Sequence, residues 1–189
     1  MHSQDIVGAL AGAAPDGAVE AAPAADGMPA IYIARAHVAA VCEALRDRPD
    51  LRFAFAADTT AVDFIPREPR FEVVIHVASF GVAGFGETAK RLRIKVRLPG
   101  DDPSMPTLSG VWPALNWAER EVYDMFGIHF DGHPDMRRIL MPDDWEGHPA
   151  RKDYPVQIVM KPKVYEPLQV TADEFVTNIQ ATRDRARKD

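Results

Sequence analysis

The chain has a single cysteine among its 189 residues, so it cannot form an internal disulfide or hold a metal cluster on four thiolates. This residue, Cys42, falls on the apolar face of a predicted helix, which indicates a small buried side chain rather than a nucleophile. No apolar run approaches the roughly 20 residues that cross a bilayer. The N-terminus also lacks the basic and apolar regions of a secretory signal. We therefore expect a protein of the reducing cytoplasm that does not itself span a membrane.

An excess of positive charge is also absent, because 28 acidic residues outnumber 22 lysines and arginines and the net charge is -6. That balance disfavours nucleic acid as a partner. Gly81, Gly84 and Gly86 do not have the spacing of a dinucleotide-binding loop, no Lys-Ser or Lys-Thr pair follows them, and the next predicted element is a strand. The sequence therefore contains no recognisable nicotinamide, flavin or ATP site.

The remaining composition is that of an ordinary globular protein, 47% hydrophobic and 26% charged, at a length that favours one core. Residues 1–29 have few large side chains and are expected to form a disordered leader. Residues 30–127 are predicted to form an α+β domain, a small mixed or antiparallel sheet with helices packed on it. We expect strands at 31–34, 51–57, 71–80 and 91–98, a helix at 36–48 and a hairpin loop at 81–89.

The strand at 91–98 alternates between apolar residues and a basic set, Arg91, Arg93, Lys95 and Arg97. Side chains two residues apart share one face of a sheet, so these four cations lie together. Two interpretations stay open: a solvated outer sheet face, which is the commoner cause, or a surface that meets an acidic partner.

The stretch from Trp112 to Pro155 differs from the rest, because it holds all three tryptophans and a dense cluster of charge. It is predicted to begin as a helix that is capped by Ser109 and ends at Gly127. At about 100° per residue, its apolar side chains converge on one stripe, which predicts the core face. That stripe consists of Val111, Leu115, Ala118, Val122 and Met125.

The other sides of this helix carry polar and aromatic residues. Glu119 and Glu121 are expected at the borders of the stripe, and Arg120 is placed to pair with Asp124 one turn on. Aromatic residues mixed with arginine and carboxylates are typical of the centre of a protein–protein interface. The aromatic members here are Trp112, Trp117 and Tyr123. We therefore interpret this helix as a partner-binding surface.

Residues 128–189 are predicted to form a long extended tail that wraps a partner subunit. Cations alternate with carboxylates over a proline-rich stretch, which suits charge-assisted contacts. Apolar residues such as Trp145 argue against disorder. A last short helix is expected at 172–184. The cations are Arg137, Arg138, Arg151 and Lys152.

A metal site is the rival interpretation. His129, Asp131, His133 and Asp135 would share one side of an extended strand and could bind a divalent cation, with Glu119 or Glu121 as a base. The chain would then be a stand-alone metal-dependent hydrolase. Gly132 and Pro134 interrupt the extended geometry that this alternation needs. Histidine and aspartate at such turns more often bind backbone groups.

The spacing of the charged residues resembles one known family. Glu119-Arg120-Glu121, Asp124, His133, Arg137 and Ile139-Leu140 follow the motif of the thirty-kilodalton subunit of respiratory complex I, and Met141–Pro155 is also similar to that family. The likeness covers roughly residues 31–155. The leader and the loop at 81–89 depart from the family pattern.

This resemblance implies a cofactor-free subunit of the peripheral arm of NADH:quinone oxidoreductase, on the cytoplasmic side of the bacterial inner membrane. It would dock on the large subunit that helps form the quinone site, while FMN, iron–sulfur clusters, NADH and quinone bind to other subunits. A corresponding subunit of a membrane-bound hydrogenase-type complex is the alternative.

The resemblance implies no catalytic, cofactor-binding or metal residue in this chain, and it assigns the motif residues to the partner interface. The expected interface residues are Trp112, Trp117, Glu119, Arg120, Glu121, Tyr123, Asp124, His133, Arg137, Arg138, Trp145, Arg151 and Lys152.

Overall fold

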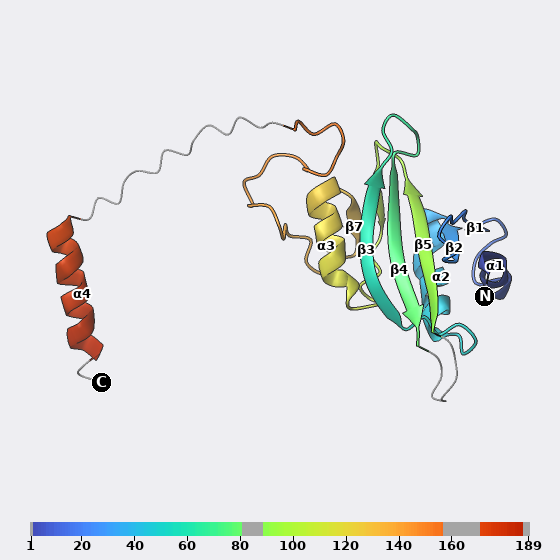
Figure 1. Ribbon diagram of the computed structural model, residues 1–189, viewed down its shortest axis with the longest axis horizontal. Helices are drawn as coiled ribbons and strands as arrows, with labels where there is room; N and C mark the ends of the chain where they lie inside the picture. The colour runs from blue at the N-terminus through green and yellow to red at the C-terminus, as the bar shows by residue number, and fades with distance from the viewer. Residues whose placement is uncertain (1, 81–88, 157–170, 187–189) are drawn as a thin grey trace. The chain divides into compact units, whose positions relative to one another are not determined.

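The computed structural model describes residues 2–80, 89–156 and 171–186 (Figure 1). The predicted hairpin loop, apart from Ala89, and the predicted extended stretch at 157–170 lie outside these residues. The helices are α1 (Ser3–Ala9), the 3-10 turn η1 (Arg35–His37), α2 (Val38–Asp47), α3 (Leu115–Phe126) and α4 (Ala172–Ala186). The strands are β1 (Val19–Ala21), β2 (Ala30–Ile33), β3 (Phe55–Asp63), β4 (Phe71–Ser79), β5 (Lys90–Leu98), β6 (Ser104–Pro106) and β7 (His129–Asp131).

Five strands form the main sheet in the order β1-β2-β5-β4-β3. β4 runs antiparallel to both of its neighbours, so that Phe71 lies opposite Leu98 on β5 and opposite Asp63 on β3. β2 runs parallel to β5, and β1 runs antiparallel to β2. β6 and β7 form a separate parallel pair. The predicted α+β fold with a small mixed sheet and packed helices is confirmed.

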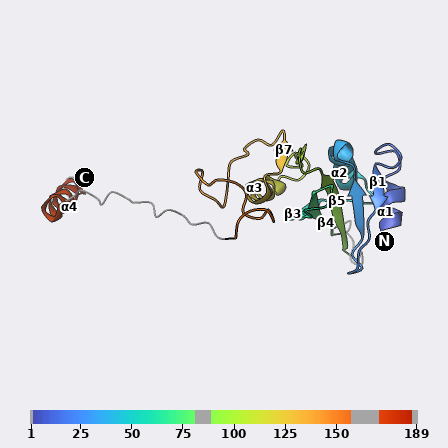
Figure 2. The ribbon, with the colours of Figure 1, turned by 90° about the horizontal axis from the view of Figure 1, so that it is seen from above.

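One face of the sheet carries the core. Leu92, Ile94 and Val96 alternate along β5 and are all fully buried. They belong to one cluster with the inner sides of α2 and α3, and Figure 2 shows α2 against that face. Cys42 lies on α2 in this cluster, where burial raises the pKa of its thiol, as expected for an unreactive side chain.

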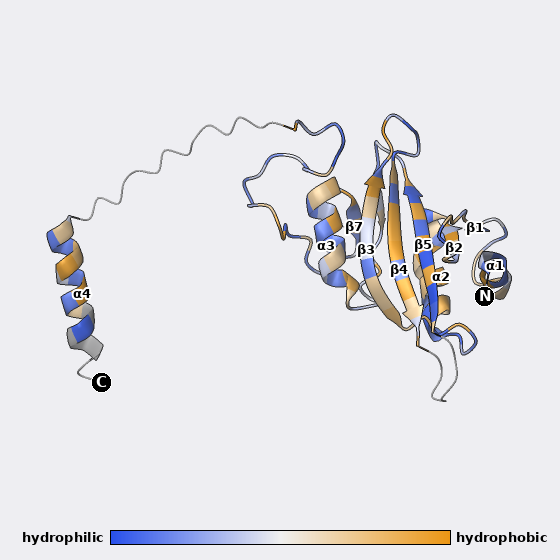
Figure 3. Cartoon of the chain, in the orientation of Figure 1, coloured by the Kyte–Doolittle hydropathy of each residue, from blue (hydrophilic) through white to orange (hydrophobic). Residues whose placement is uncertain are grey.

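The opposite face of the sheet is more polar, and Figure 3 shows the alternation as blue and orange bands along β5. Two of its four cations are paired within the chain: Arg93 lies 2.7 Å from Asp26, and Lys95 lies 2.8 Å from Glu72. Arg97 stacks on a tyrosine ring. These contacts favour an outer face of the sheet whose charge is largely balanced internally.

The expectation of a disordered leader is wrong for residues 2–29. Ile6 and Leu10 are one turn apart at α1 and bury fully against the core, and β1 extends the sheet beside β2. Few large side chains are needed because small ones also bury here: Ala18 is 8% exposed and Ala22 is 6% exposed. Figure 1 places α1 next to β1, at one edge of the sheet.

Two element boundaries also differ from prediction. The strand expected at 51–57 begins at Phe55, because Arg52 has a φ of 46° and breaks the extended run, although Leu51 and Phe53 are buried as core residues. α3 begins at Leu115 after Ala114, not after Ser109, while Gly127 ends it as predicted with a φ of 70°.

The region expected to be an extended tail is divided. β7 pairs with β6, and the chain up to Pro155 belongs to one compact unit, Met1–Pro155, separate from Val156–Asp189. In the second unit, α4 confirms the predicted last helix and is capped by Thr171, whose hydroxyl accepts a bond from the Glu174 N–H. Within the described residues, no helix has both the length and the hydropathy needed to cross a bilayer.

Candidate partner-binding surface

The inner side of α3 joins the core, and so does Trp112, which precedes the helix and was predicted to lie at the surface. Leu115 and Val122 are buried as expected. Trp112 is only 2% exposed, and its indole N–H donates to the backbone oxygen of Phe53 at 2.9 Å. Trp112 is therefore a core residue, and its assignment to an exposed interface is corrected. Helical periodicity placed it on a flank, but the helix begins only after it, at Leu115.

Asp124 holds the chain that follows β7. Its carboxylate is fully buried and accepts hydrogen bonds from the N–H groups of Ile139, Leu140 and Met141 at 2.8–3.0 Å and from Arg138 at 2.6 Å. Burial alone would raise the pKa of Asp124, but these four donors outweigh it and hold that pKa below its ordinary value. Its ion-pair partner is thus Arg138, which corrects the predicted pairing with Arg120.

Arg120 complements this contact from one turn earlier on α3. Its guanidinium donates to the backbone oxygens of Arg137 and Arg138 at 3.0 and 3.2 Å, and it lies over the Trp117 ring at 5.2 Å. Asp135 is a weaker partner at 4.0 Å. Arg120 therefore donates to carbonyl groups of this loop, and Asp124 accepts from its N–H groups. Donors and acceptors of the loop backbone both find partners on α3.

The C-terminal end of α3 is covered by residues further along the chain. The last carbonyl groups of a helix have no partner within the helix, and residues 148–151 supply donors for them here. These bonds run from His148 to Asp124 at 2.9 Å, from the Ala150 N–H to Met125 at 3.0 Å and from Arg151 to Phe126 at 2.5 Å. We call residues 133–155 the wrapping segment, because they line α3 and then cover its end.

Gly127 lets the wrapping segment approach this closely. A Cβ there would lie 2.5 Å from the His148 and Arg151 side chains, and the φ of 70° is itself unfavourable for other residues. We expect Gly127→Ala to lower the free energy of unfolding by about 2 kcal/mol, measured by urea denaturation. Gly110→Ala is the matched control, because no atom lies within 4 Å of its Cβ. Equal stability of the two variants would contradict this explanation.

A second set of contacts, which sequence analysis missed, fixes the far end of the wrapping segment. We call this set, formed by Asp63, Arg70 and Asp153, the clamp. Arg70 donates to Asp63 at 2.8 and 3.0 Å and to Asp153 at 2.8 Å, and the Lys152 N–H donates to Asp63 at 3.0 Å. Bonds from Arg70 hold the pKa of Asp63 well below its usual range. Asp63 lay between the strands predicted at 51–57 and 71–80 and carried no signal, whereas Arg70 directly precedes the second of them.

Glu119 and His133 meet inside the molecule and not on its surface. The Glu119 side chain is 1% exposed, and its carboxyl accepts bonds from the Thr107 hydroxyl at 2.5 Å and from the Leu108 N–H at 2.7 Å. His133 is equally buried and binds the Asn116 oxygen at 3.0 Å. Burial raises the pKa of Glu119 to about 7, although the bonds from Thr107 and Leu108 act to lower it.

The rival metal set is not assembled. His129 and Asp131 are exposed at 3.8 Å from one another, whereas His133 is turned inward and accepts a bond from the Asp135 N–H. Among the residues that the structure describes, no three histidine, cysteine or acidic side chains are grouped as metal ligands.

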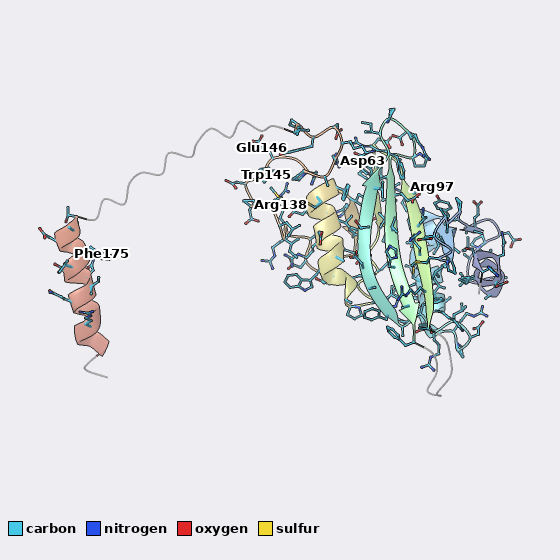
Figure 4. All side chains as sticks on the ribbon, in the orientation of Figure 1. Asp63, Arg97, Arg138, Trp145, Glu146 and Phe175 are labelled. Atoms are coloured by element: carbon cyan, nitrogen blue, oxygen red, sulfur yellow. The ribbon has the colours of Figure 1, made fainter. Side chains whose placement is uncertain are left out.

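Other members of the predicted interface remain at the surface. Trp117 is 65% exposed on α3, and Leu140 is 59% exposed on the wrapping segment. Arg137, Glu121 and Lys152 are also exposed. Tyr123 is half-buried with its ring edge toward His148, and Trp145 is half-buried in the loop that Figure 4 shows beside Arg138. An outward face of α3 and its wrapping segment thus combines large apolar side chains with charge.

Residues 31–158 match the family model described as "Respiratory-chain NADH dehydrogenase, 30 Kd subunit". The chain belongs to this family. An NADH-quinone oxidoreductase subunit from Roseiflexus sp. (strain RS-1) is 48% identical over 126 residues, which cover 67% of this chain and 69% of that protein. The corresponding NADH-quinone oxidoreductase subunit from Rhizobium meliloti (strain 1021) is 42% identical over 157 residues, covering 83% and 80%.

Solved structures of this 30 kDa family and of a related assembly share the fold. A trypsin-resistant fragment of Nqo5 superposes with a TM-score of 0.53 at 27% identity, covering 71% of this chain and 99% of the fragment. A chain of a membrane-bound sulfane sulfur reductase, an archaeal respiratory membrane complex, gives 0.59 at 27% identity, covering 81% and 85%. The resemblance drawn from the sequence motif is therefore confirmed.

Proposed function

We propose that the chain is a non-catalytic subunit of the peripheral arm of a proton-translocating NADH:quinone oxidoreductase. It docks on the large quinone-site subunit and supports electron transfer from NADH to quinone without binding a cofactor itself. FMN and the iron–sulfur clusters belong to other subunits, and the complex carries this chain on the cytoplasmic side of the inner membrane.

The observation that carries this proposal is the contrast between the two sides of α3. Its motif residues Glu119, Arg120 and Asp124 are engaged in contacts within the chain, whereas Trp117 remains 65% exposed. A large aromatic side chain that contacts a neighbouring arginine but is mostly exposed to solvent is typical of an interface centre. The intrachain clamps make this surface rigid before a partner arrives, which lowers the entropy cost of association.

Two features support a protein partner over a small substrate. The exposed residues of this surface project from a helix and a flanking loop, whereas substrate sites are concave and enclosed. The buried carboxyls lie where a substrate does not reach them. A hydrogenase-type complex is the second candidate, favoured by the likeness to the sulfane sulfur reductase chain, and identification of the subunits that purify with the native chain decides between the two.

We expect Trp117→Ala to weaken association with the partner subunit by about 2 kcal/mol, or roughly 30-fold. The physical reason is loss of the exposed ring that Arg120 holds at 5.2 Å. The measurement is the amount of assembled complex on native gels of membranes, together with NADH:quinone activity per assembled complex. Trp117→Phe, which retains a ring, should restore much of the assembly.

Phe55→Ser is the matched control, because Phe55 is a 46% exposed aromatic residue on the outer face of the sheet. Both purified variants should keep the unfolding temperature of the parent chain. Equal loss of assembly in both variants would contradict a specific role of α3. Normal assembly without turnover in Trp117→Ala would favour a catalytic role instead.

A further inference from the structure

Glu119 is a buried carboxyl with a hydrogen-bonded route to the surface. Its Oε2 lies 2.5 Å from Thr107 Oγ1, and Thr107 Oγ1 lies 2.8 Å from Ser109 Oγ. Glu119 is 1% exposed, whereas Ser109 is half-buried and precedes the exposed Gly110. Two hydroxyl groups therefore lead from an enclosed carboxyl to a partly exposed residue.

The hydroxyl pair can serve both protonation states of the carboxyl. With Glu119 ionised, Ser109 donates to Thr107 and Thr107 donates to Oε2. With Glu119 protonated, the carboxyl donates to Thr107 and Thr107 donates to Ser109, since a hydroxyl both donates and accepts. The Ser109 N–H donates to Thr107 Oγ1 at 3.1 Å in either case, and the Leu108 N–H donates to Oε1 at 2.7 Å. No hydrogen bond has to be lost when the state changes.

His133 does not compete for this proton. Its Nδ1 accepts the Asp135 N–H at 3.0 Å, so Nε2 carries the hydrogen and donates to the Asn116 oxygen at 3.0 Å. The Glu119 oxygen is further from Nε2, at 4.0 Å.

The other titratable groups on the elements around Glu119 are engaged elsewhere or exposed. Asp63 at the end of β3 is bound to Arg70, and Asp131 on β7 is exposed beside His129. On α3 itself, Arg120 binds the wrapping segment. His133 lies 4.0 Å from the Glu119 carboxyl and directs its ring N–H to the backbone oxygen of Asn116 instead.

The structure assigns a proton-binding site to Glu119, which exchanges one proton with solvent through Thr107 and Ser109. A proton from water passes to Ser109 Oγ, the Ser109 proton passes to Thr107 Oγ1, and the Thr107 proton passes to Glu119 Oε2. Release runs the same steps in reverse. Because Glu119 ties α3 to the turn at 107–109, the proton changes the strength of that contact. Burial raises the pKa of Glu119 to about 7, so the site is part-occupied near neutral pH.

The test is carboxyl NMR of the purified full chain with 13C-labelled glutamate, followed from pH 4 to pH 9. We expect one glutamate resonance, absent in Glu119→Gln, to titrate near pH 7. Thr107→Val removes the bond to the ionised form and should move that midpoint upward by about one pH unit. Ser109→Ala keeps the hydrogen bond between Thr107 and Glu119. It should leave the Glu119 midpoint within about 0.3 pH units of the parent value and slow proton exchange. A Glu119 midpoint near 4.5, or no change in Thr107→Val, would overturn the assignment.

Stability provides a second readout. The folded pKa of Glu119 lies above its ordinary value of 4.5, so its contribution is complete below that pH and is lost as pH rises through about 7. The shift corresponds to a roughly 300-fold change in the ratio of folded to unfolded protein. Glu119→Gln should therefore gain stability relative to the parent chain between pH 5 and pH 8. A difference in stability between Glu119→Gln and the parent chain that did not change with pH would count against the site, even if both chains assemble into the complex.

Discussion

Asp124→Asn should release the wrapping segment from α3 and lower the free energy of unfolding by about 3–5 kcal/mol. The amide replaces a carboxylate oxygen with an N–H₂ donor in a site where four donors converge, the closest being Arg138 at 2.6 Å. It leaves Arg138 without its buried counter-charge, and the new N–H₂ group faces either Arg138 or the three backbone N–H groups, which need an acceptor. Urea denaturation of the purified chain gives the stability, and native gels of membranes give the amount of assembled complex.

Limited trypsin digestion separates this local effect from general unfolding. In Asp124→Asn, the released wrapping segment should be cut after Arg137 and Arg138 under conditions in which the parent chain is intact. Asp131→Asn is the control, because its side chain is 60% exposed and lies 3.8 Å from His129. If Asp124→Asn kept the stability and trypsin resistance of the parent chain, the hydrogen bonds to 138–141 would not be what holds the segment.

The sequence predicted the charged motif but not its partners. Arg120 and Asp124 are four residues apart, and that spacing normally indicates a pair on one helix face. In the structure each side chain binds backbone groups of residues 137–141 instead. A sequence pattern does not show which backbone groups will be left without partners, and an irregular loop beside a helix has many.

The other differences in the candidate surface have separate causes. Trp112 was assigned to the exposed side because helical periodicity placed it on a flank of the helix, but the position lies before the first helical residue and turns into the core. Asp63 carried no signal because the strand before it was predicted to end at residue 57, and Arg70 only preceded the next predicted strand. The periodic elements, β4, β5 and the inner side of α3, were predictable because alternation and helical spacing report burial directly.

Intrachain order and partner binding are thus complementary in this subunit. The contacts of Glu119, Arg120 and Asp124 hold the wrapping segment against α3, and the exposed Trp117 and Leu140 are presented by elements that these contacts fix. Substitution of Asp124 and substitution of Trp117 should both lower assembly. Only the first should also lower the stability of the isolated chain, which separates the two roles experimentally.

Asp63→Asn should detach the far end of the wrapping segment from β3 and lower the free energy of unfolding by about 3 kcal/mol at pH 7. The Asp63 side chain is 1% exposed and Arg70 is 12% exposed, so the pair is shielded from water. The folded pKa of Asp63 lies below its ordinary value of 3.8, so its contribution is present above that pH and is lost as pH falls toward the folded pKa. The difference between variant and parent should therefore shrink in urea titrations carried out below about pH 4.

Asp153→Asn tests the outer arm of the same clamp. Asp153 also binds Arg70 at 2.8 Å, but its side chain is 47% exposed, so water and salt screen the contact. We expect this variant to lose less than about 1 kcal/mol at pH 7. Equal losses in Asp63→Asn and Asp153→Asn would mean that burial does not govern the strength of the clamp. A difference between Asp63→Asn and the parent chain that stayed constant from pH 7 to pH 3 would show that the ionised carboxylate is not its source.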